Sequence, residues 1–172
     1  MKKLIRYLIY KTKIRYTTNK SIALNYFRND DNYIAKATDF LNNNNFFSSS
    51  KYFIWVDTKN FKVNIFEGDN KNWRLIKSYL CTIGKPSTPT PKGDFKVGIK
   101  GLYFGVEKGY KCWYYTQIID DYLFHSIIYN LNGTVRDGRL GMALSNGCIR
   151  LKLENAKWIW DNIPKDTSIH IN

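Results

Sequence analysis

Two residues of this sequence have the chemistry of a nucleophile and its base. Cys148 stands in the segment Ser145–Leu151, SNGCIRL, and His125 stands 23 residues earlier in FHSIIY. A thiol with a pKa of about 8.5 is mostly protonated at neutral pH, so a nucleophilic cysteine needs a nearby base, usually histidine. In such a pair the imidazole accepts the thiol proton and later returns it to a leaving amine.

The residues around Cys148 add groups that an acyl-transfer site would use. Gly147 permits a close backbone approach, and the N–H groups of Gly147 and Cys148 are candidate donors to an oxyanion. If the segment is extended, Arg150 shares a face with Cys148, so its guanidinium is a candidate ligand for a substrate carboxylate. Ser145 and Asn146 are further candidate substrate-binding residues. Each signal is weak alone, because a free cysteine is more often simply buried.

The remaining cysteines and histidine indicate neither a metal site nor a disulfide scaffold. Cys81, Cys112 and Cys148 form an odd number without a C-x-x-C pair, so at least one thiol should be free. Cys81 and Cys112 stand in aromatic or apolar runs and are expected to be inert core thiols. His170 stands near the C-terminus and is expected to be structural. We therefore expect no metal and no cofactor.

The composition is that of a basic globular protein with one core. Its 172 residues include 27 Lys and Arg against 14 Asp and Glu, a net charge of +13. Such a charge attracts nucleic acid, anionic membranes and acidic wall polymers alike. There is no RNP signature, Cys/His finger or basic zipper, so we expect no nucleic-acid partner. Contact with an anionic wall polymer or a membrane surface stays open, and we expect a monomer.

The N-terminal twenty residues begin with Lys2 and Lys3 in the manner of a signal peptide. Arg6 then interrupts the apolar stretch, and no clean hydrophobic region or cleavage site follows. No stretch of the sequence approaches the roughly 20 apolar residues of a membrane-spanning helix. The sequence alone therefore gives no export route.

From Lys51 onward the pattern is that of short strands. Lys51–Asp57 and Phe61–Gly68 flank a turn and predict a hairpin. Further strands are predicted at 73–84, 95–101, 111–119, 122–129 and 167–172, and a helix at 154–163 that Pro164 ends. This order predicts a mainly β fold, a sandwich or barrel with a short helix near the C-terminus, and not a βαβ arrangement.

Upstream of Lys51 the sequence changes character. Asp30 or Asp31 can cap a helix whose apolar face includes Ile34 and Ala37 and which stops at the asparagines of 42–45. Residues 46–50 have the composition of a linker. We therefore divide the chain into a basic, partly helical or irregular N-terminal appendage, residues 1–50, and a catalytic domain, residues 51–172.

The order of several motifs is more informative than any one of them. IWVDTKNFKVNIFEG, STPTPKGDFKV, FHS, LGMALSNGCIRL and ENAKWIWDNIPKDTSIHI follow one another between Tyr52 and the C-terminus. This series resembles the L,D-transpeptidase catalytic domain, the YkuD or ErfK family. That family has a T-P-x-G loop, then a strand with a histidine, then an [S/T]-H-G-C-h-[R/N] signature. The resemblance implies the family's β fold, with Cys148 as nucleophile, His125 as base and the backbone carbonyl of Ser126 orienting the ring.

The resemblance also implies a reaction on peptidoglycan stem peptides. The thiolate attacks the carbonyl of the third-position diamino acid, D-Ala leaves, and an amine of a second stem resolves the thioester into a 3→3 cross-link. Water as the acceptor would make the protein an L,D-carboxypeptidase. Such a substrate implies a location in the cell envelope, outside the membrane, and the family is acylated by carbapenems. A non-catalytic wall-binding module is the alternative of another class.

Asn146 departs from the family pattern, which usually has histidine two residues before the cysteine. Asparagine cannot shuttle a proton near neutral pH. Because His125 matches the position of the family's base, we predict that activity survives this replacement. The 23 residues between His125 and Cys148 also exceed the usual spacing, and 130–138 is the segment where an insertion would most easily lie.

Overall fold

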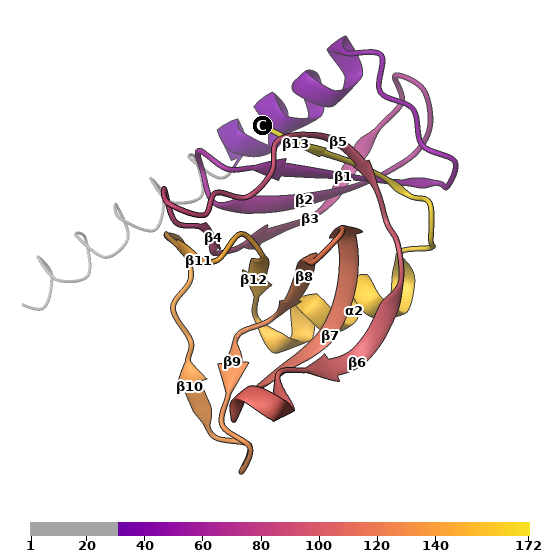
Figure 1. The fold of residues 1–172 in the computed structure, drawn as a ribbon. Helices are drawn as coiled ribbons and strands as arrows, with labels where there is room; N and C mark the ends of the chain where they lie inside the picture. Colours follow the sequence, from indigo (N-terminus) through magenta and orange to yellow (C-terminus); the bar gives the residue numbers. More distant parts are fainter. Residues whose placement is uncertain (1–30) are drawn as a thin grey trace, which may run out of the picture. The chain divides into compact units, whose positions relative to one another are not determined.

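A computed structural model describes residues 31–172 of the chain (Figure 1). The described part of the chain divides into two units between Phe40 and Leu41. The predicted helix is present over residues 31–43. The basic segment 1–30 lies outside the described residues, so the division of the chain at residue 50 stays a prediction.

The larger unit is built from two main β-sheets, one short strand pair and one helix. The first sheet has the order β3-β2-β1-β13-β5 and contains β1 (Tyr52–Asp57), β2 (Lys62–Glu67), β3 (Arg74–Leu80), β5 (Gly93–Lys96) and β13 (Ser168–Ile171). The second sheet has the order β10-β9-β7-β8-β12, with β6 on β7, and contains β6 (Lys100–Phe104), β7 (Lys111–Ile119), β8 (Tyr122–Ser126), β9 (Ile128–Tyr129), β10 (Val135–Asp137) and β12 (Ile149–Leu151). The remaining elements are β4 (Ile83–Gly84) paired with β11 (Ala143–Ser145), the 3-10 helix η1 (Val106–Lys108) and α2 (Leu153–Asn162). The predicted mainly β fold with a C-terminal helix is confirmed.

The predicted hairpin is formed by β1 and β2, which pair antiparallel with Ile54 opposite Ile65 and Val56 opposite Val63. These four side chains are fully buried. They share one core with residues of the second sheet, of α2 and of its C-cap, namely Phe124, Ile149, Leu151, Ala156, Ile159 and Ile163. Burial of such side chains is the main stabilising contribution to a fold of this size.

Helix α2 lies against β7 and β8 and covers the face of the second sheet that carries Phe124 (Figure 1). Its buried residues Ala156 and Ile159 are spaced as one helical face requires. The backbone N–H of Ile163 bonds back to Ile159 O, and Pro164 follows at once. The helix thus ends where the sequence predicts and supports the strand that carries His125.

Residues 46–50 differ from the predicted linker. Ser48 is buried, and its Oγ accepts a hydrogen bond from the Ser168 N–H at 3.1 Å. The hydroxyls of Ser50 and Thr167 lie 2.8 Å apart. The linker interpretation was therefore wrong, because serine side chains that suit a solvated loop also suit hydrogen bonding to an adjacent strand.

Two parallel strand pairings place distant segments together. β1 pairs with β13, the last strand of the chain. β8 pairs with β12, and in this register Arg150 lies opposite His125 and Ile149 opposite Phe124. The β8–β12 pairing carries the end of SNGCIRL to the strand of the histidine, so it is the feature of the fold that builds the candidate site.

Candidate active site

His125 is the most fixed member of the predicted set. It stands on β8 and is only 4% exposed. Its Nδ1 lies 2.6 Å from the backbone O of Ser126, a contact that fits an Nδ1–H donor and leaves Nε2 as the basic nitrogen. The ring of Phe104 meets the imidazole edge-to-face with centroids 5.2 Å apart. The predicted contact between the imidazole and Ser126 O is therefore present.

Cys148 closes a tight loop that enters β12. The Ser145 hydroxyl accepts a hydrogen bond from the Gly147 N–H at 3.1 Å and donates one to Cys148 O at 2.5 Å. The Cys148 thiol lies 3.4 Å from the backbone O of Asp121, in the turn between β7 and β8. Ser145 thus shapes the loop around the cysteine, and at 2% exposed it is less suited to substrate contact than the sequence suggested.

The Gly147 N–H is not aimed at a substrate, in contrast to our expectation. Because this N–H donates its hydrogen bond to Ser145 Oγ, it is not available to an oxyanion. Of the two candidate donors, the Cys148 N–H is the one that remains for that role. Sequence reasoning missed this because the hydroxyl of a serine two residues earlier can bond such an N–H only in this turn geometry.

Gly147 itself is required by the shape of the loop. Its φ is +109°, and a Cβ at this position would lie 2.3 Å from Cε1 of Tyr122. We expect Gly147→Ala to lower the free energy of unfolding by about 2 kcal/mol or more, through backbone strain and overlap. Urea unfolding measures the loss. Gly133→Ala is the control, since Gly133 has φ +87° but open space around it; equal losses in the two variants would contradict the overlap.

A threonine of the T-P-x-G loop supports the cysteine loop. Thr90 is 5% exposed, accepts a hydrogen bond from the Gly84 N–H at 2.9 Å and donates one to Gly147 O at 2.8 Å. Thr88 Oγ1 lies 3.3 Å from Ser145 O, a weaker contact. In the sequence this motif was only part of the family pattern; in the structure its threonine bonds to the loop that carries Cys148.

Two cavities meet at Cys148. The smaller, of about 100 Å³, is lined by Phe104, Tyr110, Cys112, His125, Ile128, Ser145, Asn146, Cys148 and Arg150. The larger, of about 580 Å³, is lined by Ile99, Phe104, Lys108, Tyr110, Tyr115, Gln117, Asp120, Asp121, Leu123, Asn146 and Cys148. Asn146 is exposed and borders both. The structure therefore brings Cys148, His125, Asn146 and Arg150 to one site, open on a second side to a wider groove.

Burial keeps both members of the pair uncharged near neutral pH. The pKa of His125 is lowered to about 4, chiefly because the ring is removed from water and also by the charge of Arg150, while its bond to Ser126 O opposes the shift. Burial raises the pKa of the Cys148 thiol, and the Leu123 N–H and Arg150 offset part of that rise. A neutral imidazole accepts protons, so this arrangement suits general-base activation of a thiol.

Arg150 lies where the sequence placed it but is already paired. Its side chain is 12% exposed, and Nη1 lies 2.9 Å from Oδ2 of Asp137. Arg139 binds the same carboxylate through Nε and Nη2, both at 2.9 Å. Sequence reasoning missed Asp137, because the segment 130–138 was interpreted only as the place of an insertion. The one sequence signal for this ion pair was a carboxylate shortly before the segment that contains Arg150.

The other cysteines and His170 were expected to have structural roles. Cys81 and Cys112 are both buried, and burial raises the pKa of Cys112 to about 12. Cys112 also lines the smaller cavity, so it is not simply a core residue. His170 Nδ1 lies 2.7 Å from Asp94 Oδ1, and the Phe46 ring packs on the imidazole at 4.8 Å. Within residues 31–172, no group of three His, Cys, Asp or Glu side chains is placed to hold a metal ion.

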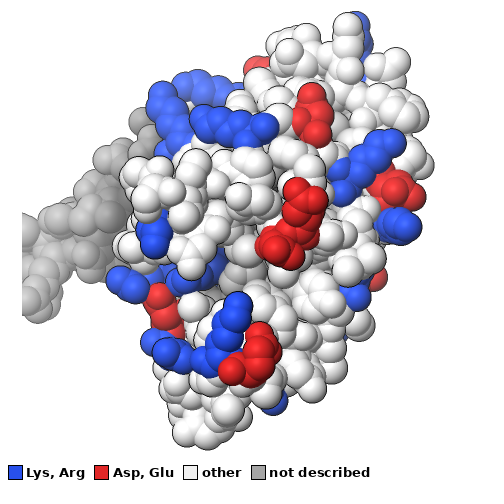
Figure 2. Space-filling view, viewed as in Figure 1, with Lys and Arg blue, Asp and Glu red and all other residues white. Residues whose placement is uncertain are grey.

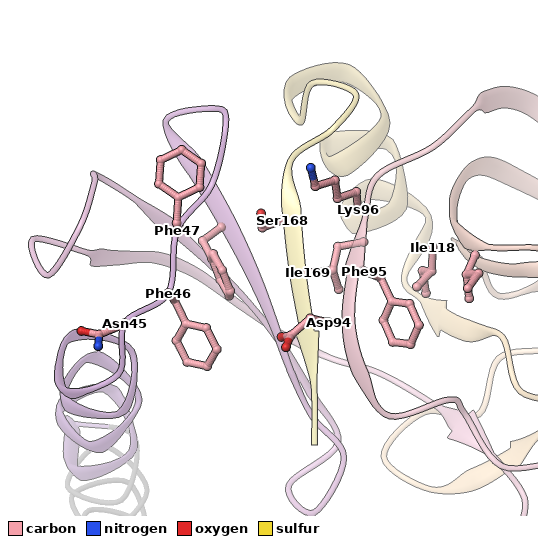
Figure 3. A pocket seen from close by; sticks show the side chains of 11 residues that line it. Asn45, Phe46, Phe47, Asp94, Phe95, Lys96, Ile118, Ser168 and Ile169 are labelled. Atoms are coloured by element: carbon pink, nitrogen blue, oxygen red, sulfur yellow. The ribbon is translucent and has the colours of Figure 1, made fainter.

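A separate cavity of about 560 Å³ lies at the first sheet, with linings from residues 45–47, 53, 94–96, 118–119 and 168–169. Figure 3 shows Phe46 and Phe47 on one side of β13 and Phe95 on the other. Among the described residues that line it there is neither a cysteine nor a histidine. It is larger than the cavity around His125, but the candidate nucleophile and base, Cys148 and His125, line the smaller one.

The positive charge of the chain is unevenly distributed along the sequence. Eight of the 27 Lys and Arg residues stand in the first 30 residues, beside a single acidic residue, Asp30. On the face drawn in Figure 2, basic side chains lie beside acidic ones in several places. Within residues 31–172 no helix has the length and hydropathy needed to cross a membrane.

Comparison with known proteins identifies relatives of this arrangement. The sequence profile of the L,D-transpeptidase catalytic domain, YkuD, matches residues 51–171. YciB of Bacillus subtilis (strain 168), a protein whose name places it among the L,D-transpeptidases, is 33% identical over 128 residues. That alignment covers 69% of this chain and 66% of YciB.

Solved structures show the same fold. One, from Clostridium acetobutylicum and described as a fused Zn-dependent amidase/peptidase/peptidoglycan-binding domain-containing protein, has a TM-score of 0.71 and 44% identity. It is matched over 83% of this chain and 61% of its own. An L,D-transpeptidase from Mycobacterium smegmatis has a TM-score of 0.56 at 18% identity, over 71% of this chain and 58% of that one. The chain thus spans about two thirds or less of the length of each of these relatives.

Proposed function

Because this chain belongs to the L,D-transpeptidase catalytic domain family, we propose that it is a peptidoglycan L,D-transpeptidase that forms 3→3 cross-links through a thioester on Cys148. The observation that supports this most strongly is the shared cavity of Cys148, His125 and Arg150, with the imidazole fixed by Ser126 O. A buried core cysteine would need neither a fixed neutral base nor an open groove.

In the proposed first half-reaction, His125 Nε2 takes the thiol proton as the sulfur of Cys148 attacks the carbonyl of the third-position diamino acid. The tetrahedral oxyanion is stabilised by N–H donors, for which Cys148 N–H is the candidate. Collapse breaks the peptide bond, and the imidazolium gives its proton to the departing amine of D-Ala. The product is a thioester between the tripeptide stem and Cys148.

In the second half-reaction an amine of another stem attacks the thioester. His125 Nε2 accepts the proton of that amine, and the thiol of Cys148 leaves with a proton as the new amide forms. The 580 Å³ groove beside Cys148 supports this step, since it offers room for an acceptor and is not lined by Arg150. Water entering by the same route would give the L,D-carboxypeptidase reaction.

The protein's own reaction is tested by incubation with purified tetrapeptide muropeptides and analysis of products by mass spectrometry. We expect free D-Ala together with dimers linked between two third-position residues. D-Ala with tripeptide but no dimer would replace the transpeptidase by the carboxypeptidase. No release of D-Ala at all would contradict the enzymatic proposal in favour of a wall-binding module.

Asn146→His restores the family's usual residue at a position that is exposed and borders both cavities. We expect kcat/KM for D-Ala release to stay within about threefold of the unaltered protein or to rise, because the base role belongs to His125. Initial rates over a range of tetrapeptide concentrations measure this. A fall of a hundredfold would show that the Asn146 amide has a positioning role of its own.

The proposal extends to where the protein acts. Peptidoglycan stems are the proposed partners, so the site of action is the cell envelope, outside the membrane. The basic residues of 1–30 favour attraction to an anionic wall polymer or membrane surface. Fractionation of cells producing the full chain tests this, and recovery of all the protein with cytoplasmic markers would contradict it.

A further inference from the structure

The guanidinium of Arg150 is held by a residue outside the family signature. Asp137 Oδ2 lies 2.9 Å from Nη1 of Arg150, and both side chains are largely buried, 17% and 12% exposed. Asp137 belongs to β10, in the segment between His125 and Cys148 that the sequence suggested as an insertion. An ion pair shielded to this degree holds its geometry better than an exposed one.

The backbone of Arg150 is fixed independently of that pair. Arg150 pairs with His125 where β12 lies beside β8. The Arg150 N–H donates a hydrogen bond to Thr82 O at 2.9 Å, and Arg150 O accepts one from the Thr82 N–H at 3.0 Å. These bonds fix the Cα but not the long side chain, which has several rotatable bonds. The Asp137 carboxylate is therefore the contact that settles where the charge of Arg150 lies.

Asp137 is in turn oriented by its own neighbours. Arg139 binds it with two side-chain bonds and a backbone N–H at 3.1 Å. These bonds, with that of Arg150, hold the pKa of Asp137 well below its usual range, so it remains ionised. One carboxylate between two guanidinium groups leaves the cluster with net positive charge, which can still attract an anion.

The residue before Asp137 in β10 contacts another part of the cavity lining. Arg136 Nη1 donates to Gly109 O at 3.2 Å, and its guanidinium lies 5.8 Å from the ring centroid of Tyr110, which lines both cavities at Cys148. Adjacent residues of one short strand thus contact Tyr110 and Arg150. β10 lies beside β9 (Figure 1), so this short strand pair contacts two residues that line the cavity.

From this we infer that Asp137 is a positioning residue, which holds Arg150 beside Cys148 and His125 so that its guanidinium receives the C-terminal carboxylate of the donor stem. The inference rests on the proposed function for the identity of that carboxylate, the one on D-Ala. The bond to Asp137 uses Nη1, and a guanidinium carries further donors on Nε and Nη2. Asp137 thereby sets specificity for a free terminal acid without touching it.

Calorimetry on proteins that carry Cys148→Ala tests this specificity for a free C-terminal carboxylate, because these proteins bind a stem without reacting with it. The ligands are tetrapeptide stems with L-lysine or meso-diaminopimelate at position three, each as the free acid and as the C-terminal amide. We expect the acid to bind about tenfold or more tightly than the amide. Asp137→Asn should reduce that preference to about twofold or less, and Asp137→Glu should restore part of it.

Asp161→Asn is the control, because it also removes a carboxylate from an ion pair, here the more exposed pair with Lys157 on helix α2. It should keep the full preference for the acid. An unchanged preference in Asp137→Asn, or equal binding of acid and amide by the starting protein, would overturn the inference. Lack of D-Ala release by the protein with Cys148 intact would count against the proposed function alone, since the binding preference requires no reaction.

Discussion

Cys148→Ala is expected to abolish release of D-Ala from tetrapeptide stems, lowering kcat/KM by about 10⁴-fold or more. The thioester cannot form without the sulfur, and the remaining groups of the site only bind and polarise the substrate. The variant should fold normally, because the Cys148 side chain is partly exposed and lies outside the buried core. Steady-state rates and a thermal unfolding midpoint measure the two properties together.

Cys81→Ala is the control for loss of a thiol. Cys81 is fully buried and lines neither cavity at Cys148, so its replacement should lower stability but leave kcat/KM within about threefold. Carbapenem, the acylating agent implied by the family, should add once to the unaltered protein and not to Cys148→Ala. Turnover by Cys148→Ala, or an adduct on Cys112, would contradict the assignment of the nucleophile.

His125→Gln should lower kcat by about 10²- to 10⁴-fold, because glutamine can hydrogen-bond but cannot accept the thiol proton. The amide replaces the ring with a smaller polar group, so KM should change much less than kcat. Single-turnover rates of D-Ala release measure the acylation step directly. A variant as fast as the unaltered protein would show that another group activates Cys148.

The same variant reports on the charge of the buried ring. The pKa of His125 is lowered from 6.5 to about 4, so the folded state disfavours the protonated ring. The stability from a neutral His125 is present above pH 6.5 and is lost as pH falls toward 4, by about 3 kcal/mol in full. Unfolding midpoints from pH 7 to pH 4 should fall more steeply for the unaltered protein than for His125→Gln, and parallel curves would contradict the buried neutral imidazole.

The strands and the last helix follow from local patterns that the sequence displays. The alternation in Phe61–Gly68 predicts a strand, although the structure buries β2 on both faces, and Pro164 limits α2. The parallel pairing of β8 with β12 has no comparable local signal, because it depends on how two segments 25 residues apart pack. The site residues were therefore named from motif order, whereas their geometry required the fold.

Side-chain partners were the least predictable part of the site. Thr90 donates a hydrogen bond to Gly147 O, and Arg150 donates one to Asp137. Neither pair is adjacent in the sequence, and many other threonines and aspartates could have filled these roles. The Gly147 N–H was expected to face the substrate, but its nearest acceptor is the Ser145 hydroxyl. Short-range polar contacts of this kind depend on loop conformations that composition does not specify.

The central claim is that Cys148 carries the tripeptide stem as a thioester. Intact-mass analysis of the protein after rapid mixing with a tetrapeptide stem and quenching in acid measures this most directly, with peptide mapping to locate the added mass. We expect an increase equal to the tripeptide acyl group, located on Cys148 and absent from Cys148→Ala. Release of D-Ala with no mass on Cys148, or with the acyl group on another residue, would contradict it.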